Sequence, residues 1–113
     1  MTHLKIDYVE FASGDLAKSK AFFDRAFGWT FQDYGPDYAA MTNAGLDGGL
    51  QSDPAEASAL PLVILKADDL EAAEAAVTGA GGVITRAIFS FPGGRRFHFR
   101  EPGGNELAVW SEK

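Results

Sequence analysis

The sequence contains no cysteine. Disulfide bonds, thiolate metal sites and cysteine nucleophiles are therefore all excluded. Only two histidines are present. His3 lies near the start of the chain, where side chains are poorly ordered, so we assign it no functional role. His98 is the one histidine with a candidate role.

Long hydrophobic runs are also missing. No uninterrupted apolar stretch approaches the roughly 18 residues that a membrane-spanning helix needs. The opening residues, MTHLKIDYVEF, do not show a basic region followed by an apolar run, as a secretory signal would. We therefore expect a soluble cytoplasmic protein without a membrane partner.

Basic residues are too few to balance the acidic ones. The formal net charge is −6 and the calculated isoelectric point is about 4.7. Nucleic acids and anionic membranes are bound by basic surfaces, so neither is an expected partner. With 113 residues, 46% of them hydrophobic, the chain can bury one core, and we expect a single domain over 1–113.

What the sequence does contain is an internal repeat of a strand, a turn and a helix. Its two copies are VEFASGDLAKSKAFFDRAFGW (9–29) and VILKADDLEAAEAAVTGAGGV (63–83). One offset aligns Asp15 with Asp69, where each aspartate can cap a helix N-terminus. The same offset aligns Gly28 with Gly82, where a left-handed glycine can end the helix. The chain is therefore predicted to be two related modules.

Three further strands are predicted after each helix, so each module has the order β-α-β-β-β. The modules cover 1–51 and 61–113, and a connection without strand periodicity covers 52–60. The predicted strands cover 4–11, 29–34, 38–42, a short segment near Leu50, 62–65, 83–88, 95–100 and 105–110.

The repeat and its motifs resemble the vicinal oxygen chelate superfamily, which includes glyoxalase I, bleomycin-resistance proteins, fosfomycin-resistance enzymes and extradiol dioxygenases. The motifs are the Asp15-Leu16 helix start, Phe22-Phe23, Phe27-Gly28-Trp29 and the closing FHFREPGGNEL (97–107), in which Glu101 replaces the usual Asp. The resemblance implies an α+β fold whose two βαβββ modules curl mixed sheets around a cavity, and it implies a homodimer. One scaffold of this kind supports many reactions, so no activity follows from it.

The sequence departs from the resemblance at the positions where metal-using members carry their ligands. Those positions hold Tyr8, Leu62, Ala108 and either Gly48 or Gly49. A catalytic divalent ion needs about three protein ligands. We therefore predict no family metal site and no cofactor.

A shifted metal site is an alternative that the residue types leave open. Strand alternation puts His98 opposite Phe97 and Phe99, so His98 faces the cavity if the two phenylalanines pack under a helix. Together with Glu10 and Glu106, His98 would supply ligand types that suit zinc, iron or manganese. Glu106 has an equally simple interpretation as a solvated residue at a strand end.

Six side chains are predicted to line the cavity and bind a ligand. They are Tyr8, Glu10, Tyr38, Leu62, His98 and Trp110. Glu10 and His98 are also the candidate catalytic residues, because a buried carboxylate can act as a base and a histidine can carry a proton. Glu10 can equally be a surface carboxylate, His98 a structural histidine, and the three aromatic residues parts of a core. Arg95-Arg96 could receive an anionic group, but a solvated pair beside a hairpin turn is the expected interpretation.

The leading functional hypothesis is a protein that binds a small organic molecule in a metal-free aromatic and polar cavity. A hydrophobic or cationic compound would suit rings beside the Glu10 carboxylate. The first alternative is an enzyme, either a metal-dependent lyase or oxygenase with shifted ligands or a metal-free isomerase using Glu10 or His98. The second alternative is a dimeric regulatory or partner-binding module.

Overall fold

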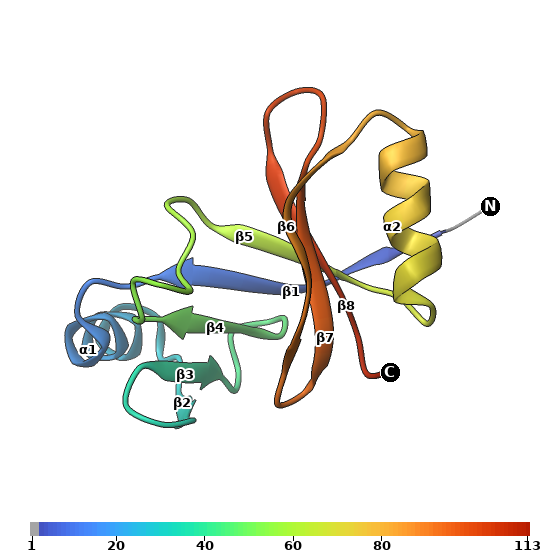
Figure 1. Ribbon diagram of the computed structural model, residues 1–113. Helices are drawn as coiled ribbons and strands as arrows, with labels where there is room; N and C mark the ends of the chain where they lie inside the picture. Colours follow the sequence, from blue (N-terminus) through green and yellow to red (C-terminus); the bar gives the residue numbers. More distant parts are fainter. Residues whose placement is uncertain (1–2) are drawn as a thin grey trace. The chain divides into compact units, whose positions relative to one another are not determined.

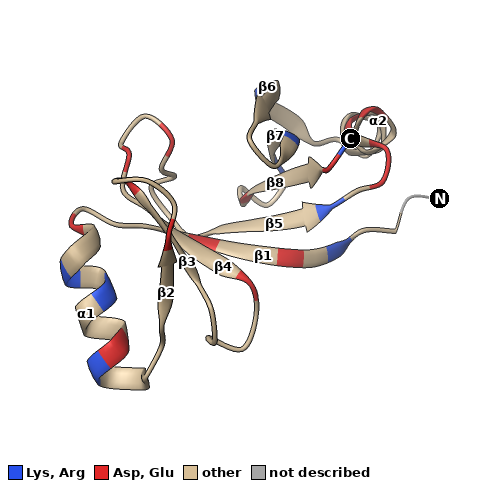
Figure 2. Cartoon of the chain, turned by 90° about the horizontal axis from the view of Figure 1, so that it is seen from below, with Lys and Arg blue, Asp and Glu red and all other residues tan. Residues whose placement is uncertain are grey.

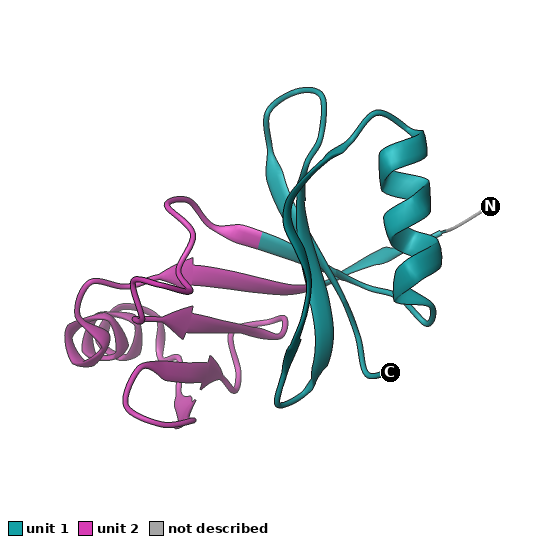
Figure 3. Ribbon diagram, viewed as in Figure 1, with its two compact units in different colours: residues 1–7, 63–113 teal, residues 8–62 magenta. Residues whose placement is uncertain are grey.

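The computed structural model describes residues 3–113, and the chain divides into two compact units (Figure 3). Unit 2 comprises residues 8–62. Unit 1 comprises residues 63–113 together with the described residues up to Asp7. The element order is two successive β-α-β-β-β runs, which confirms the predicted α+β fold (Figure 1).

Unit 2 contains the first run. Its elements are β1 (Lys5–Ala12, which begins in unit 1), α1 (Leu16–Phe27), β2 (Phe31–Asp33), β3 (Tyr38–Met41) and β4 (Gly48–Gln51). The strands lie in the order β2-β3-β4-β1, with β4 parallel to β1 and antiparallel to β3. β4 begins earlier than predicted, because the glycines assigned to a turn belong to the strand.

Unit 1 contains the second run. Its elements are β5 (Leu62–Lys66, whose first residue belongs to unit 2), α2 (Leu70–Gly79), β6 (Val83–Phe91), β7 (Gly94–Arg100) and β8 (Glu106–Ser111). The strands lie in the order β5-β8-β7-β6, with β5 parallel to β8 and the other pairs antiparallel. β6 runs three residues past the predicted end at Ile88, up to the hairpin turn.

The helix starts agree with the predicted repeat. Asp15 accepts a hydrogen bond from the Lys18 amide at 3.1 Å, and Asp69 accepts one from the Ala72 amide at 3.0 Å. Each carboxylate therefore satisfies one amide that a helix N-terminus leaves unpaired.

The helix ends agree only in part. Gly28 follows α1 with φ 73°, as predicted for a left-handed cap. The prediction for Gly82 is wrong, because α2 ends at Gly79 and the positive φ falls on Gly81, at 98°. A Cβ at Gly82 would lie 2.6 Å from Val77 Cγ1, so this glycine is needed for close approach to the helix.

The core of unit 1 lies between α2 and one face of the strands (Figure 1). Leu70 and Ala73 of α2 are buried against Phe97 and Phe99 of β7 and Val109 of β8. Phe97 and Phe99 therefore pack under a helix, which was the condition set for His98 to face the other way. Strand alternation then places His98 on the opposite face of β7.

α1 of unit 2 packs through aromatic rings and buries less than α2. None of its 12 residues, all of them described, is buried. Phe23 stacks on Trp29 with centroids 4.9 Å apart and lies 6.3 Å from Phe11, whereas Phe22 and Phe27 remain about 60% exposed. Figure 2 shows residues of both charge signs spread along α1. Among the described residues, no helix is both long enough and apolar enough to cross a membrane.

Candidate functional site

Three of the six predicted site residues form a hydrogen-bonded cluster in unit 2. The hydroxyl of Tyr8 lies 2.6 Å from the hydroxyl of Tyr38, which donates to Glu10 Oε2 at 2.9 Å. Glu10 is buried, with 5% of its surface exposed, and both tyrosines are half-buried. The interpretation of Glu10 as a surface carboxylate is therefore wrong.

Glycine on the strand between them lets the tyrosines meet. Tyr8 and Glu10 alternate onto one face of β1, whereas Tyr38 comes from β3, with β4 in between. A Cβ at Gly49 of β4 would lie 2.1 Å from Tyr38 Oη and 2.7 Å from Tyr8 Oη. The two tyrosine hydroxyls therefore meet over β4 at Gly49, where the strand has no side chain. Gly49 was missed as a site residue because its sequence context is typical of a turn.

Burial and the neighbouring carboxylate keep the two phenols protonated. The pKa of Tyr8 is raised chiefly by burial, with a further contribution from the charge of Glu10. Burial also raises the pKa of Tyr38, and the Glu10 charge adds to the effect. At neutral pH the cluster therefore offers two neutral hydroxyls and a carboxyl group, which suit hydrogen bonding to a ligand.

Leu62, the fourth predicted residue, stands at the first position of β5 and is 1% exposed. Its side chain offers no polar group, so any part in binding would be through apolar contact.

His98 and Trp110 belong to unit 1. His98 is 4% exposed, and its Nδ1 lies 4.0 Å from Oε2 of Glu106. The same Glu106 oxygen accepts a hydrogen bond from Thr85 Oγ1 at 2.8 Å. Glu106 is therefore held by neighbours within unit 1, rather than simply solvated.

The indole of Trp110 is fixed by its own unit. Its Nε1 donates to Asp7 Oδ2 at 2.9 Å, and Lys66 Nζ lies 5.0 Å from the ring centroid. Phe91 contacts the ring at a centroid distance of 6.1 Å. Trp110 thus presents a ring of fixed orientation.

The two arginines after the hairpin turn differ from the expected solvated pair. Arg95 forms a two-point ion pair with Glu71 of α2, at 2.6 and 3.0 Å. Arg96 points to the other face of β7 and is only 9% exposed. The prediction that both arginines are solvated is therefore wrong for Arg96. Successive residues of a strand point to opposite faces, so Arg96 is buried although Arg95 is not.

The residues at the family's metal-ligand positions do not fit a divalent ion. Leu62, Ala108 and either glycine, Gly48 or Gly49, offer no side-chain donor atom, and the Tyr8 hydroxyl is hydrogen-bonded to Tyr38. Among residues 3–113, no group of three or more His, Asp or Glu side chains could hold a metal ion.

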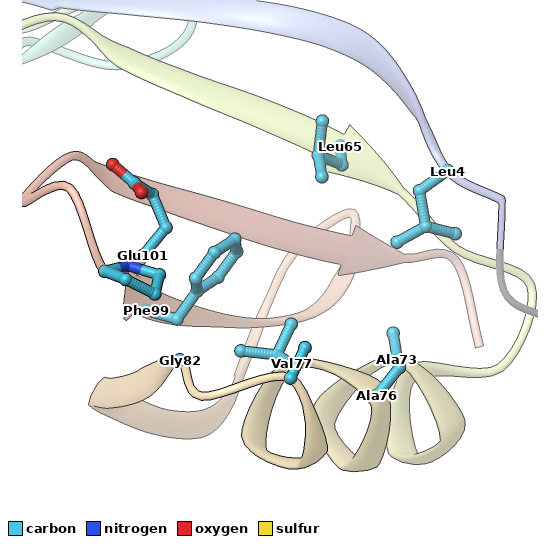
Figure 4. A pocket seen from close by; sticks show the side chains of 10 residues that line it. Leu4, Leu65, Ala73, Ala76, Val77, Gly82, Phe99 and Glu101 are labelled. Atoms are coloured by element: carbon cyan, nitrogen blue, oxygen red, sulfur yellow. The ribbon is translucent and has the colours of Figure 1, made fainter.

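A separate apolar hollow of about 320 Å³ lies between α2 and the strands of unit 1 (Figure 4). Ala73, Ala76 and Val77 of α2 form one wall, and Leu65 and Phe99 lie across from them. The hollow exists because the alanines of α2 leave space that larger side chains would fill. Its lining includes none of the six predicted ligand-binding residues.

Solved structures with the same fold come from several bacteria. A glyoxalase/bleomycin resistance protein/dioxygenase superfamily member from Vibrio splendidus 12B01 has a TM-score of 0.73 at 19% identity, over 96% of this chain and 99% of that one. A chain described as an NAD-dependent benzaldehyde dehydrogenase from Legionella pneumophila has a TM-score of 0.76 at 16% identity, over 94% and 98%.

A Mn(II)-bound glyoxalase from Novosphingobium aromaticivorans has a TM-score of 0.68 at 23% identity, and this chain covers 38% of its length. These likenesses show a shared fold. Comparison with the curated proteins gives no match. The family model described as Glyoxalase/Bleomycin resistance protein/Dioxygenase superfamily matches residues 5–109, so the chain belongs to that superfamily.

Proposed function

We propose that this protein binds a small organic molecule, without a metal ion, through the cluster of Tyr8, Tyr38 and Glu10. The observation that carries the proposal is the burial of a carboxyl group beside two phenols whose hydroxyls meet across a glycine. Buried polar groups cost stability unless they are paired, so a linked set is kept for specificity or for binding. Leu62, which belongs to the same unit, is proposed as a further, apolar contact.

The chemistry of the cluster favours a ligand with a cationic or hydrogen-bond-donating group and an aromatic or apolar body. Glu10 supplies the acceptor, and the tyrosine rings supply faces for stacking or cation–π contact. The resemblance to drug-binding resistance proteins agrees with sequestration as the role.

The experiment is calorimetric titration of the purified protein with a panel of aromatic amines, quaternary ammonium compounds and neutral aromatic analogues. We expect a saturable ligand among the cations, with binding weakened about tenfold or more by Glu10→Gln and by Tyr38→Phe. Asp24→Asn and Tyr34→Phe, which change exposed side chains, should bind as the wild type does. Unchanged affinity in both cluster variants, or a panel without any binder, would refute the proposal.

Metal-free proton transfer is a second candidate function. Glu10 is buried beside a hydroxyl donor, which is the setting in which a carboxyl group can become a base. If a bound compound were also converted, Glu10→Gln should abolish turnover. Loss of turnover at compound concentrations that saturate the variant would establish catalysis, whereas a bound compound that is recovered unchanged would leave sequestration as the function.

A further inference from the structure

Helix α1 of unit 2 carries an exposed aromatic surface. The rings of Phe22 and Phe27 are largely exposed, and their centroids lie 6.1 Å apart. No residue of α1, which the structure describes in full, is buried. Helices in proteins are stabilised mainly by packing of an apolar face, so α1 has little of the packing that usually holds a helix. Exposed apolar patches with a polar rim mark contact sites.

Basic residues flank Phe22 on this surface. Lys18 stands one turn before Phe22 and Arg25 one turn after it, so the three side chains lie on one face of α1. Both basic residues are exposed, and the ion pair of Lys18 with Asp15 is long, at 3.9 Å. Exposed pairs of this kind contribute little. This face of α1 therefore presents a phenyl ring between two positive charges.

The apolar hollow of unit 1 is large enough to receive such a ring (Figure 4). Its volume is about 320 Å³, and an apolar cavity of about 150 Å³ already holds benzene. Ala73 and Ala76 of α2 form part of its wall, and Phe99 lies across from them. Ala76, and Ala80 just after the helix, are exposed, so the hollow can be entered from outside.

The edge of the hollow is acidic. Glu101 contributes to the lining, and Glu74 stands one turn before Val77, which also lines the hollow. The Glu101 carboxylate accepts hydrogen bonds from the backbone amides of Gly103 and Asn105, at 2.6 and 3.0 Å, and these bonds lower its pKa. The donors are neutral, so the carboxylate keeps its negative charge at neutral pH. The charge of the hollow's edge is therefore opposite to that of the α1 surface.

We infer that α1 of one copy of this chain docks onto unit 1 of a second copy, with the ring of Phe22 inserted into the apolar hollow. Lys18 and Arg25 then lie at the acidic edge of that hollow. A two-fold axis repeats the contact, so two copies form a dimer through two equivalent contacts. The inference goes beyond the proposed function, because it concerns an interaction surface and holds whether or not the tyrosine cluster binds a ligand.

Two complementary variants test the contact. Phe22→Ser removes the ring and keeps the hollow, whereas Ala76→Leu fills the hollow and keeps the ring. Each variant alone should associate about tenfold or more weakly than the wild type in sedimentation equilibrium. A mixture of the two should form a heterodimer that is tighter than either homodimer, because the Phe22 ring of one variant can enter the open hollow of the other. Native mass spectrometry identifies the heterodimer by its mass.

The matched controls change exposed positions outside the contact. Leu60→Ser removes an exposed apolar side chain from the connection between the β-α-β-β-β runs. Ala75→Leu adds the same bulk as Ala76→Leu, on a side of α2 that does not line the hollow. Both should associate as the wild type does. Glu74→Lys changes charge without filling the hollow, so it tests the contact even if Ala76→Leu fails to fold. It should weaken association several-fold, and more so at low salt.

Three results would overturn the inference. The first is a wild-type protein that keeps the mass of one chain at every concentration. The second is wild-type association in Phe22→Ser. The third is a weakened Phe22→Ser dimer alongside wild-type association in Ala76→Leu, which would show that the ring contacts another surface, such as α1 of the second copy. A mixture that associates no better than the separate variants would also contradict insertion of the ring into the hollow.

Discussion

Gly49 is important because it has no side chain. The hydroxyls of Tyr8 and Tyr38 occupy the space that any side chain at this position would fill. The same glycine lies opposite Glu10 in the β1–β4 register, so it borders all three polar residues of the cluster. At the scale of single residues, the candidate site therefore depends on Gly49 as much as on the three polar residues.

Gly49→Ala should separate the phenols. The added methyl group cannot coexist with both hydroxyls, so we expect the unfolding free energy to fall by about 1–3 kcal/mol in urea denaturation. Gly14→Ala is the control, because nothing lies within 4 Å of the new methyl group and stability should hardly change. A Gly49→Ala protein as stable as the wild type would contradict the close approach of the tyrosines.

Tyr38→Phe should cost stability even without a ligand. The Tyr38 hydroxyl bonds both Tyr8 and Glu10, and we expect a loss of about 1–2 kcal/mol in the same denaturation experiment. Tyr34→Phe removes a hydroxyl from a side chain that is 64% exposed and should have no measurable effect. Equal stabilities for the two variants would show that the hydroxyl network adds nothing to the fold.

At the scale of elements, the two helices start alike but are held differently. Both begin at an aspartate cap, yet α2 buries Leu70 and Ala73, whereas α1 buries no residue and relies on the ring contacts of Phe23. Most helix stability in proteins comes from packing of the apolar face. The two helices should therefore differ in how readily they open.

Hydrogen exchange should show this difference. We expect the amides of α1 to exchange faster than those of α2, because fewer buried contacts oppose local opening. Asp15→Ala and Asp69→Ala remove equivalent caps, each worth about 1 kcal/mol. The first should speed exchange mainly within α1, and the second should lower the stability of the core that α2 covers. Slower exchange in α1 than in α2 would contradict this account.

For the whole molecule, charge and the buried phenols set the response to pH. The formal charge is −6 at neutral pH, and two of the three tyrosines have pKa values raised above the usual one, first by burial. An acid whose pKa is raised by folding keeps its proton in the folded state after the unfolded chain has lost it. The stability that this proton contributes is complete below about pH 10 and is lost as the pH rises further.

Alkaline unfolding should therefore be steep. Each phenol should reduce the unfolding free energy by up to about 1.4 kcal/mol per pH unit above the unfolded pKa. Tyrosinate absorbance should lag in the folded protein and then appear together with loss of structure. Tyr38→Phe should make the decline shallower. A stability that stays constant from pH 9 to pH 11, values that bracket the usual tyrosine pKa of about 10, would contradict the raised pKa values.

The molecular mass in solution tests the homodimer that we propose from the family resemblance. The chain has a mass of 12.1 kDa, and sedimentation equilibrium should give twice that value. A single species at the chain mass over a range of concentrations would refute the proposal.

Most of the fold could be predicted from the sequence, because helix caps and strand alternation are local signals. The helix starts at Asp15 and Asp69 and the alternation around His98 depend on a few neighbouring residues, and the structure confirms them. The end of α2 was predicted wrongly although it too is local. The left-handed residue is Gly81, and Gly82 instead packs against Val77, five residues earlier.

The candidate sites were reached only in part. Glu10, Tyr8 and His98 stood out as polar residues in otherwise apolar strands. Gly49 and the burial of Arg96 were not foreseen, since each depends on contacts across strands.

The sequence by itself determined two β-α-β-β-β runs, because periodicity and caps are properties of short stretches. Only the tertiary structure decided which polar side chains meet. Strand pairing brings Tyr38 over Gly49 to Glu10. Side-chain contacts of this kind depend on register, and a shift of one residue would turn every side chain to the other face.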